Sequence, residues 1–298
     1  MHGLLSILFA LVISLPAAAG QLEDGLEAYR KGEWDRAAAL LTPLAQARNT
    51  AAQEKLGRLY DRGKGVTRDY QAAARWYRQL LAQFPSDSAA PQTRYLLADA
   101  LVDSGQFAEA AQEYSLVAYG YPGYARAADA AYAGVVAQDR EEARLPAAAR
   151  EAWHEQARAA ALKFADTFPD HPEVPVVLAR AAKDLYDRKR QAEAIVVAQR
   201  LLDRGATLPA DKRRLAWAVV GHGRFELGDW SAAEAGLQQL LANLPPGDAE
   251  RAPVLDRLAV AVYRQGEAKQ AAGDVDGAVA DWLRVREVAP AAASRVTA

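Results

Sequence analysis

The chain has 298 residues, of which 51% are hydrophobic and 25% are charged, and its formal net charge is −2. This balance argues against a nucleic-acid-binding protein, which needs a basic face, and the stretch Lys212-Arg213-Arg214 is too short to supply one. The chain contains no cysteine, so disulfides and a lipid-modified cysteine are excluded.

The first twenty residues are typical of a secretory signal peptide. An apolar run from Leu4 to Leu15 is followed by Pro16 and by the small residues Ala17-Ala18-Ala19-Gly20. This pattern predicts a signal peptide over residues 1–20, cleaved after Ala19 or Gly20, and a soluble periplasmic mature chain. An uncleaved anchor is the alternative, but the run is shorter than the ~20 residues of a membrane helix.

A glycine followed by an alanine five residues later recurs along the rest of the chain. The pairs are Gly32 and Ala37, Gly105 and Ala110, Gly228 and Ala233, and Gly273 and Ala278. Glycine permits the left-handed conformation that ends a helix, and alanine lets two helix backbones approach closely. The pattern therefore predicts pairs of antiparallel helices. Trp34 and Trp230 share one position beside this turn, which predicts packing between helices and argues against a ligand cage.

Prolines mark the ends of these units, at spacings of 37, 47, 40, 36 and 45 residues: Pro85, Pro122, Pro169, Pro209, Pro245 and Pro290. They divide the chain into seven units at roughly 21–49, 50–85, 86–122, 123–169, 170–208, 209–245 and 246–290. No run of alternating β-branched residues indicates a sheet. We expect an all-α fold, an α-α superhelix (solenoid) of about seven helix-turn-helix repeats that runs as one continuous array over residues 21–298.

Two places depart from the regular pattern. In the fourth unit we expect the charged stretch Asp139-Arg140-Glu141-Glu142 to interrupt the repeat and Pro146 to open the second helix. After Pro290 the remaining residues look like the opening of an eighth unit. We therefore expect the array to continue beyond residue 298, and the seventh unit, lacking a polar capping helix, to associate with another copy.

Two segments resemble known repeat families. The stretch from Trp217 to Pro245 resembles a tetratricopeptide repeat, through Trp217, Gly221, Gly228, Asp229, Ala233 and Pro245. The stretch from Ala52 to Tyr77 is similar to a Sel1-type repeat, through Leu56-Gly57, Tyr60, Gly63, Gly65-Val66, Asp69, Ala73-Ala74 and Trp76-Tyr77. The resemblance as a whole is to repeat proteins of the bacterial cell envelope.

The tetratricopeptide resemblance implies a binding groove lined by the first helix of each unit. Carried onto this chain, the groove positions are Tyr95 and Asp99 in the third unit, Lys183 and Tyr186 in the fifth, His222 and Phe225 in the sixth, and Tyr263 and Glu267 in the seventh. Aromatic and charged residues together are typical of a protein-binding surface. A merely solvated face is the alternative.

Candidate chemical sites have simpler explanations. His154-Glu155 begins like a zinc-protease helix, but Arg158 stands where the second histidine is needed. Asp170, His171 and Glu173 have the residue types of a metal site and are explained as turn residues. Gly221-His222-Gly223 is a poor nucleotide motif, whose glycines we assign to helix packing. The sequence predicts no metal and no cofactor.

These observations predict a non-catalytic periplasmic scaffold that binds another protein or peptide of the cell envelope. The alternative is a periplasmic module of a polysaccharide-export system, in which such repeats organise a secretion channel. The least favoured class is an enzyme with its active site in the fourth unit.

Overall fold

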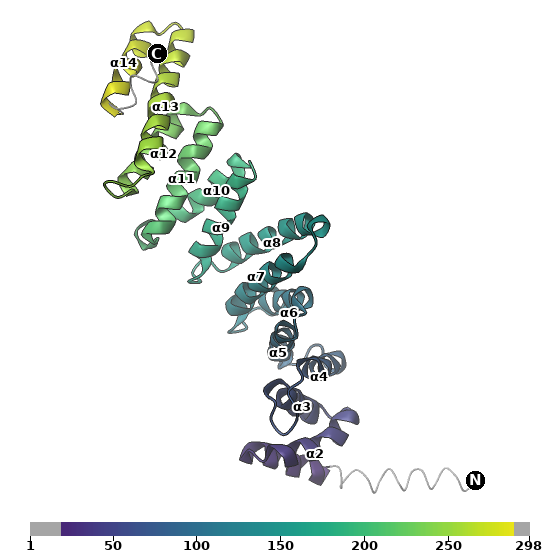
Figure 1. Cartoon of the computed structure of the whole chain (residues 1–298). Coiled ribbons are helices and arrows are strands. Elements are labelled where there is room, and N and C mark those ends of the chain that lie inside the picture. Colours follow the sequence, from purple (N-terminus) through teal and green to yellow (C-terminus); the bar gives the residue numbers. More distant parts are fainter. Residues whose placement is uncertain (1–18, 289–298) are drawn as a thin grey trace, which may run out of the picture. The chain divides into compact units, whose positions relative to one another are not determined.

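The computed structural model describes residues 19–288, and in that range every regular element is helical (Figure 1). The expected eighth unit and most of the expected signal peptide lie outside the described residues. The chain divides into two compact units, residues 1–157 and 158–298. The boundary falls inside a helix, and the continuous array remains a prediction.

Four successive helical hairpins begin in the first unit. The second helix of the fourth hairpin continues past residue 157 into the second unit. A helix over residues 19–31 pairs with α2 (Trp34–Gln46), α3 (Thr50–Arg62) with α4 (Tyr70–Gln83), and α5 (Ala90–Asp103) with α6 (Phe107–Gly120). The fourth hairpin is formed by α7 (Ala127–Arg144) and α8 (Ala147–Thr167). From α2 to α7, each helix contacts the next one along the chain.

The second unit contains three further hairpins. They are α9 (Val174–Asp187) with α10 (Gln191–Leu202), α11 (Ala210–Glu226) with α12 (Trp230–Asn243), and α13 (Arg251–Ala271) with α14 (Val275–Val288). A short 3-10 turn, η1 (Gly205–Thr207), precedes α11. Helices α9 and α11, the first helices of two consecutive hairpins, also contact each other. Over the described residues, the predicted all-α solenoid of seven helical hairpins is confirmed.

The predicted turn geometry is confirmed at all four glycines of the pattern. Gly32, Gly105, Gly228 and Gly273 have φ values of 77°, 79°, 75° and 85°. Each turn closes in the same way, as in the first hairpin, where the N–H of Glu33 donates to the carbonyl of Ala28 over 2.9 Å. This bond satisfies a carbonyl that the helix end leaves unpaired. The alanine five residues after each glycine is fully buried: Ala37, Ala110, Ala233 and Ala278.

The fifth hairpin uses the same turn with a lysine in place of glycine. Lys189 has a φ of 62°, and the N–H of Arg190 donates to the carbonyl of Leu185 over 2.9 Å. Ala194, five residues later, is again fully buried. The left-handed conformation is unfavourable for a residue with a Cβ, so the glycine pattern alone did not indicate this turn.

The fourth hairpin corrects one expectation and confirms another. The charged residues 139–142 do not interrupt the repeat, because α7 runs without a break from Ala127 to Arg144. Arginine and glutamate are good helix formers, and Glu142 contacts His154 of α8. Pro146 does open the second helix: it directly precedes α8, and its carbonyl accepts the N–H groups of Ala149 and Arg150.

The Sel1-like segment forms the second hairpin. Gly57 lies against the buried ring of Tyr77, since a Cβ on Gly57 would come within 2.7 Å of that ring. Gly65, in the long turn between α3 and α4, approaches the backbone of Trp34 so closely that a Cβ would lie 2.1 Å from its carbonyl oxygen. The side chain of Asp69 accepts the N–H of Ala72 over 2.8 Å and begins α4. These contacts account for the glycines and the aspartate of the segment.

Helix pairs approach most closely where small residues meet. A Cβ added to Gly236 of α12 would lie 2.8 Å from the Cα of Gly221 on α11. One added to Gly223 would lie 3.0 Å from Ile195 of α10. The assignment of these glycines to helix packing is therefore confirmed. Ala233 of α12 is also buried, in the interface between α11 and α12, which we call the seam.

We expect Ala233→Leu to lower the free energy of unfolding by about 1–3 kcal/mol, because the larger side chain overpacks the seam between α11 and α12. The matched control is Ala235→Leu, the same substitution at an exposed position of the same helix, which we expect to be nearly neutral. Chemical denaturation of both variants measures the difference. Equal stability of the two variants would show that the seam is assigned to the wrong face of α12.

Candidate protein-binding surface

The eight residues expected to line a groove fall into two groups, since Tyr95 and Asp99 belong to the first unit and the others to the second. Tyr95, on α5, is only 6% exposed. Its ring meets that of Tyr114 edge to face at 5.4 Å, and the guanidinium of Arg126 lies 3.6 Å above it. The structure therefore differs from the expectation here: Tyr95 lies in a helix interface and Arg126 covers it.

Asp99 lies one turn further along α5 and is partly buried. The hydroxyl of Tyr114 donates a hydrogen bond to its carboxylate over 2.5 Å. Burial raises the pKa of Asp99, although this hydrogen bond favours the ionised form. A pocket of about 260 Å³ lies next to this pair and is lined by Val102, Tyr114, Tyr132, Ala133, Val136, Ala137 and Arg140. Tyr114, the partner of Asp99, thus lines a small, mainly apolar recess.

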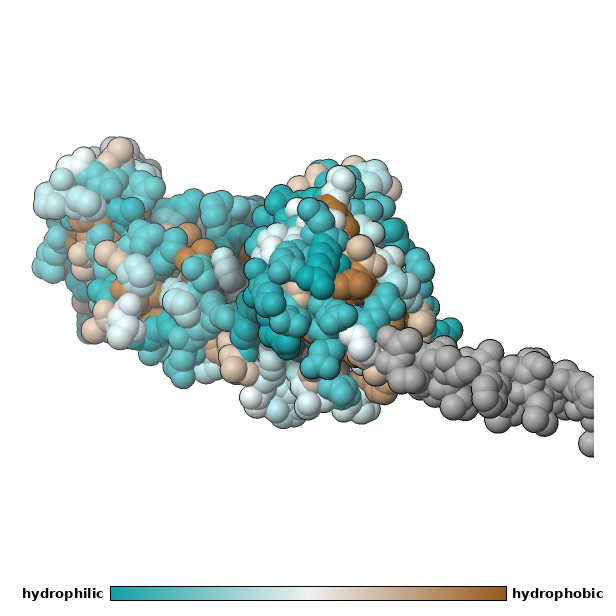
Figure 2. All heavy atoms as spheres, turned by 90° about the horizontal axis from the view of Figure 1, so that it is seen from below, coloured by the Kyte–Doolittle hydropathy of each residue, from teal (hydrophilic) through white to brown (hydrophobic). Residues whose placement is uncertain are grey.

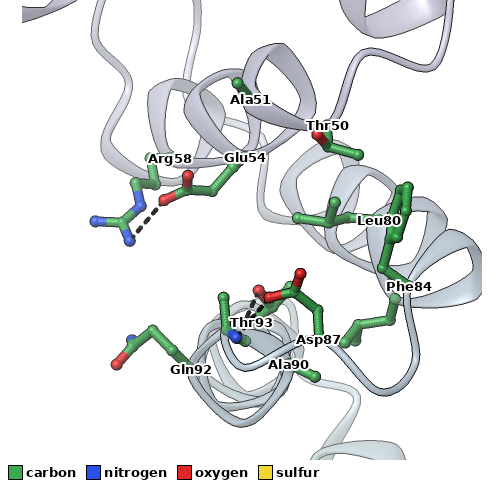
Figure 3. Close-up of a pocket in the computed structure, with 12 residues that line it drawn as sticks. Thr50, Ala51, Glu54, Arg58, Leu80, Phe84, Asp87, Ala90, Gln92 and Thr93 are labelled. Atoms are coloured by element: carbon green, nitrogen blue, oxygen red, sulfur yellow. Dashed lines mark hydrogen bonds and ion pairs between the residues drawn. The ribbon is translucent and has the colours of Figure 1, made fainter.

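A larger pocket of about 420 Å³ lies between α3, α4 and α5 (Figure 3). Leu80 and Phe84 of α4 lie on one side, while Arg58 and Glu54 of α3 and Gln92 of α5 border the other. Arg58 pairs with Glu54 over 2.9 Å, and Asp87 accepts the N–H of Ala89 over 2.7 Å. The pocket therefore combines apolar side chains with polar ones, which include Thr50, Gln92 and Thr93.

In the second unit, three expected residues gather around one that the sequence did not indicate. Glu226, at the end of α11, accepts hydrogen bonds over 2.5 Å from the hydroxyl of Tyr186 and from the amide of Gln191. The ammonium of Lys189 lies 3.7 Å from the same carboxylate. Partial burial opposes ionisation, but the bonds from Tyr186 and Gln191 hold the pKa of Glu226 below its usual value. Glu226 thereby links the hairpin of α9 to that of α11.

Arg257 of α13 extends the group to a third hairpin. Its guanidinium lies 5.7 Å from the centre of the Phe225 ring, and its charge acts on both His222 and Tyr186. Phe225 itself meets Trp230 edge to face at 5.3 Å, as Tyr29 meets Trp34 at 5.4 Å in the first hairpin. The predicted packing role of both tryptophans is confirmed. We call the following residues the Glu226 cluster: Tyr186, Lys189, Gln191, His222, Phe225, Glu226 and Arg257.

His222 is the most strongly perturbed titratable group of the Glu226 cluster. Burial, reinforced by repulsion from Arg257, lowers its pKa to about 4. Its Nδ1 is buried and has no hydrogen-bond partner. His222 is therefore a neutral ring near pH 7, and it contributes to the surface by shape and not by charge.

The other three expected residues lie outside the Glu226 cluster. Lys183 is exposed and pairs with Asp187 over 2.5 Å, and Glu267 pairs with Arg264 over 2.6 Å. Tyr263 packs against Trp282, with ring centres 6.1 Å apart, and its carbonyl accepts the indole N–H of Trp282. The structure therefore brings together Tyr186, His222 and Phe225, but not Lys183, Tyr263 and Glu267.

Two further histidines of the described residues, His154 and His171, occupy structural positions. His171 packs edge to face on Phe164 at 5.0 Å, and its Nδ1 accepts the N–H of Glu173 over 3.2 Å, as expected for a turn. His154 was expected on a helix surface, but it is half-buried and its Nδ1 lies 2.8 Å from the carboxylate of Glu142 on α7. Between residues 19 and 288, no group of three histidine or acidic side chains is arranged to hold a metal ion.

Hydrophilic residues dominate the face shown in Figure 2, and hydrophobic residues appear there only as small separate patches. Among the described helices, none is both long and apolar enough to cross a membrane. The Glu226 cluster combines aromatic and charged side chains. Such a mixture suits the recognition of a protein or peptide.

The chain is by its fold an all-α protein of repeated helical hairpins, and solved structures similar to it include repeat proteins. One is a tetratricopeptide repeat protein from Parabacteroides merdae, with 15% identity, coverage of 92% of this chain and 93% of that chain, and a TM-score of 0.40. Another is the TPR2AB domain of yeast Sti1 in complex with pHSP90, with 12% identity, 95% and 96% coverage, and a TM-score of 0.41.

A Sel1 repeat protein from Oxalobacter formigenes is also similar, with 16% identity, coverage of 90% of this chain and 98% of that chain, and a TM-score of 0.31. No family model matches the sequence, and no curated protein matches it significantly. At these identities the likeness concerns the fold alone.

We expect His222 to titrate near pH 4 in the folded chain, against about 6.5 for an unperturbed histidine. Because the unfolded chain then takes up a proton that the folded chain does not, stability should fall as the pH is lowered from about 6.5 to 4. Proton NMR titration measures this pKa, with His222→Gln assigning the signal.

Two comparisons make the result specific to the Glu226 cluster. Arg257→Gln should raise the pKa of His222, because it removes a repulsive charge. His222→Gln should flatten the difference in stability between pH 6.5 and 4. A His222 signal that titrates near 6.5 in the wild-type chain would contradict the burial described here.

Proposed function

We propose that this chain is a non-catalytic repeat scaffold that binds another protein or a peptide through the first helices of its hairpins. The observation that carries the proposal is the Glu226 cluster, in which side chains from α9, α11 and α13 form one connected surface. Successive hairpins of a repeat array offer such surfaces to extended partners. Tyr186 and Arg257, an aromatic residue and an arginine, are of the types that most often dominate binding energies.

The cellular setting belongs to the same proposal. Residues 1–20 have the pattern of a signal peptide, so the mature scaffold works in the periplasm and its partner is a protein or peptide of the cell envelope. The other expected groove residues belong to the proposal as further binding positions, Asp99 in the first unit and Lys183 and Glu267 in the second. Association with another copy through the C-terminal hairpin is a further part of the proposal.

The polysaccharide-export module remains the second candidate, and the Sel1-like hairpin is the observation that favours it. In that hairpin Gly57 and Tyr77, two residues that carry the Sel1 resemblance, lie in close contact. Recovery of polysaccharide synthase components with the chain would favour this candidate, while recovery of cell-wall or motor components would favour the general scaffold.

The binding surface is tested by the double variant Tyr186→Ala plus Arg257→Ala. We expect it to lose partners that the wild-type chain captures from periplasmic extract, because each anchor contributes about 2 kcal/mol, or roughly 30-fold in affinity. The matched control is Val196→Ala plus Arg200→Ala, which alters an apolar residue and an arginine on the second helix α10. Equal yields of the same partners with both variants would refute the role of the Glu226 cluster.

The export step is tested separately by the intact mass of the chain recovered from periplasm. We expect the mature protein to begin at Gly20 or Gln21, because small residues precede both positions. Retention of residues 1–19 in a membrane fraction would contradict the periplasmic part of the proposal and would leave the binding surface to be judged by the capture experiment.

A further inference from the structure

The pocket between α3, α4 and α5 lies beside a turn whose conformation recurs along the chain. In the turn from α4 to α5, the N–H of Asp87 donates to the carbonyl of Phe84 over 3.3 Å, and the N–H of Ala90 donates to the carbonyl of Asp87 over 2.9 Å. The turn from α6 to α7 makes the same two bonds around Tyr124, over 3.2 Å and 3.0 Å. The turn from α8 to α9 makes them around His171, over 3.0 Å and 3.1 Å. Asp87, Tyr124 and His171 therefore occupy equivalent positions.

An aromatic ring occupies two of these three positions. The hydroxyl of Tyr124 donates to the side-chain carbonyl of Gln92 on α5 over 2.9 Å, so the Tyr124 ring reaches back to the first helix of the hairpin that it follows. The ring of His171 meets that of Phe164 edge to face at 5.0 Å, and Phe164 is fully buried. Asp87 instead keeps its short side chain in the turn, where the carboxylate accepts a backbone N–H. Of the three turns, only the one at Asp87 lacks a ring.

The pocket gives an aromatic ring the room that this turn leaves unused. Asp87 and Leu80 border the same open space in Figure 3. Leu80 is the equivalent of Phe164, since the carbonyl of each accepts the N–H of the phenylalanine that precedes the turn. Unlike Phe164, however, Leu80 is partly exposed. The pocket measures about 420 Å³, and a cavity of about 150 Å³ is enough to hold benzene.

The charges around the pocket favour a basic group next to that ring. Glu54 is paired with Arg58 over 2.9 Å and with Lys55 over 3.2 Å. Asp87 is exposed and has no basic partner among the described residues. Of the two carboxylates that line the pocket, Asp87 is thus the one that attracts a cation. The Nε of Arg58 is buried without a hydrogen-bond partner in the described part of the chain, so it is able to donate to a carbonyl of a bound peptide.

We propose that this pocket binds an aromatic side chain of the partner, in a peptide segment where a lysine or arginine stands next to the aromatic residue. The ring fills the space that Tyr124 and His171 fill at their own turns, and the basic residue pairs with Asp87. The inference rests on the proposed function, because it takes the partner to be a protein or peptide. It adds a binding position in the first unit and states the chemistry of the segment that binds there.

NMR titration of the wild-type chain with short peptides measures this preference. We expect acetyl-Gly-Trp-Lys-Gly-amide to bind about tenfold more tightly than the peptide with leucine in place of tryptophan, because the aromatic ring fills the pocket and packs against Phe84. The peptide with glutamate in place of lysine should bind several-fold more weakly, since it brings a like charge to Asp87. Equal affinity of the tryptophan and leucine peptides, or no binding of either, would overturn the inference.

The double variant Leu80→Phe plus Asp87→His closes the pocket, because it introduces the Phe164 and His171 pair at the equivalent turn. The histidine keeps an acceptor for the backbone N–H, as the Nδ1 of His171 does in its own turn. We expect unchanged helical content and melting temperature, with affinity for the tryptophan peptide lowered at least about tenfold. Binding of that peptide at the wild-type affinity would overturn the inference.

Asp87→Asn tests the charge alone, because asparagine keeps an oxygen for the N–H of Ala89. Affinity for the lysine-containing peptide should fall about threefold, and affinity for its glutamine counterpart should not change. The matched control is Asp248→Asn, since Asp248 accepts the N–H of Glu250 in the same way over 2.9 Å in the turn before α13. Equal losses with the two variants would overturn the pairing with Asp87.

Partner capture through the Glu226 cluster is scored separately from these titrations. Failure of the peptide tests with normal partner capture would overturn this inference alone. Failure of both would refute the proposed function as well.

Discussion

The close approach of two antiparallel helices at a buried alanine is the contact on which the rest of this structure depends. Ala37, Ala110, Ala194, Ala233 and Ala278 are all fully buried, and each follows by five residues a backbone in the left-handed conformation. The turn fixes which faces of the two helices meet, and the absence of a larger side chain lets them meet closely. The side chains that these helix interfaces do not bury form the surface of the molecule.

This constraint explains why the binding surface is built across hairpins. Within a hairpin, aromatic residues next to the turn are used for packing, as Phe225 with Trp230 and Tyr29 with Trp34 show. Side chains at the ends of the first helices remain for contacts with the next hairpin, and Glu226 receives bonds from Tyr186 and Gln191 in this way. The binding of a ligand there would depend on the distance between hairpins as well as on the side chains themselves.

The hairpins were predictable from the sequence because glycine, alanine and proline report backbone geometry directly. The surface was less predictable, because a small rotation of a helix decides whether a side chain faces solvent or its neighbour. Tyr95 follows the repeat pattern and is nevertheless covered by Arg126. Arg257 has no signal in the sequence, since its role depends on how α13 is placed against α11. Residues 139–142 look like an interruption, but arginine and glutamate are good helix formers and α7 continues through them.

Lys189 belongs both to a hairpin turn and to the Glu226 cluster. Its left-handed backbone is strained for any residue with a Cβ, and its ammonium lies 3.7 Å from Glu226 and 5.9 Å from the centre of the Tyr186 ring. Glycine would relax the backbone, and asparagine would tolerate it better than lysine does, but both would remove the charge. A more stable fifth turn and the present positive charge beside Glu226 are therefore alternatives at this one position.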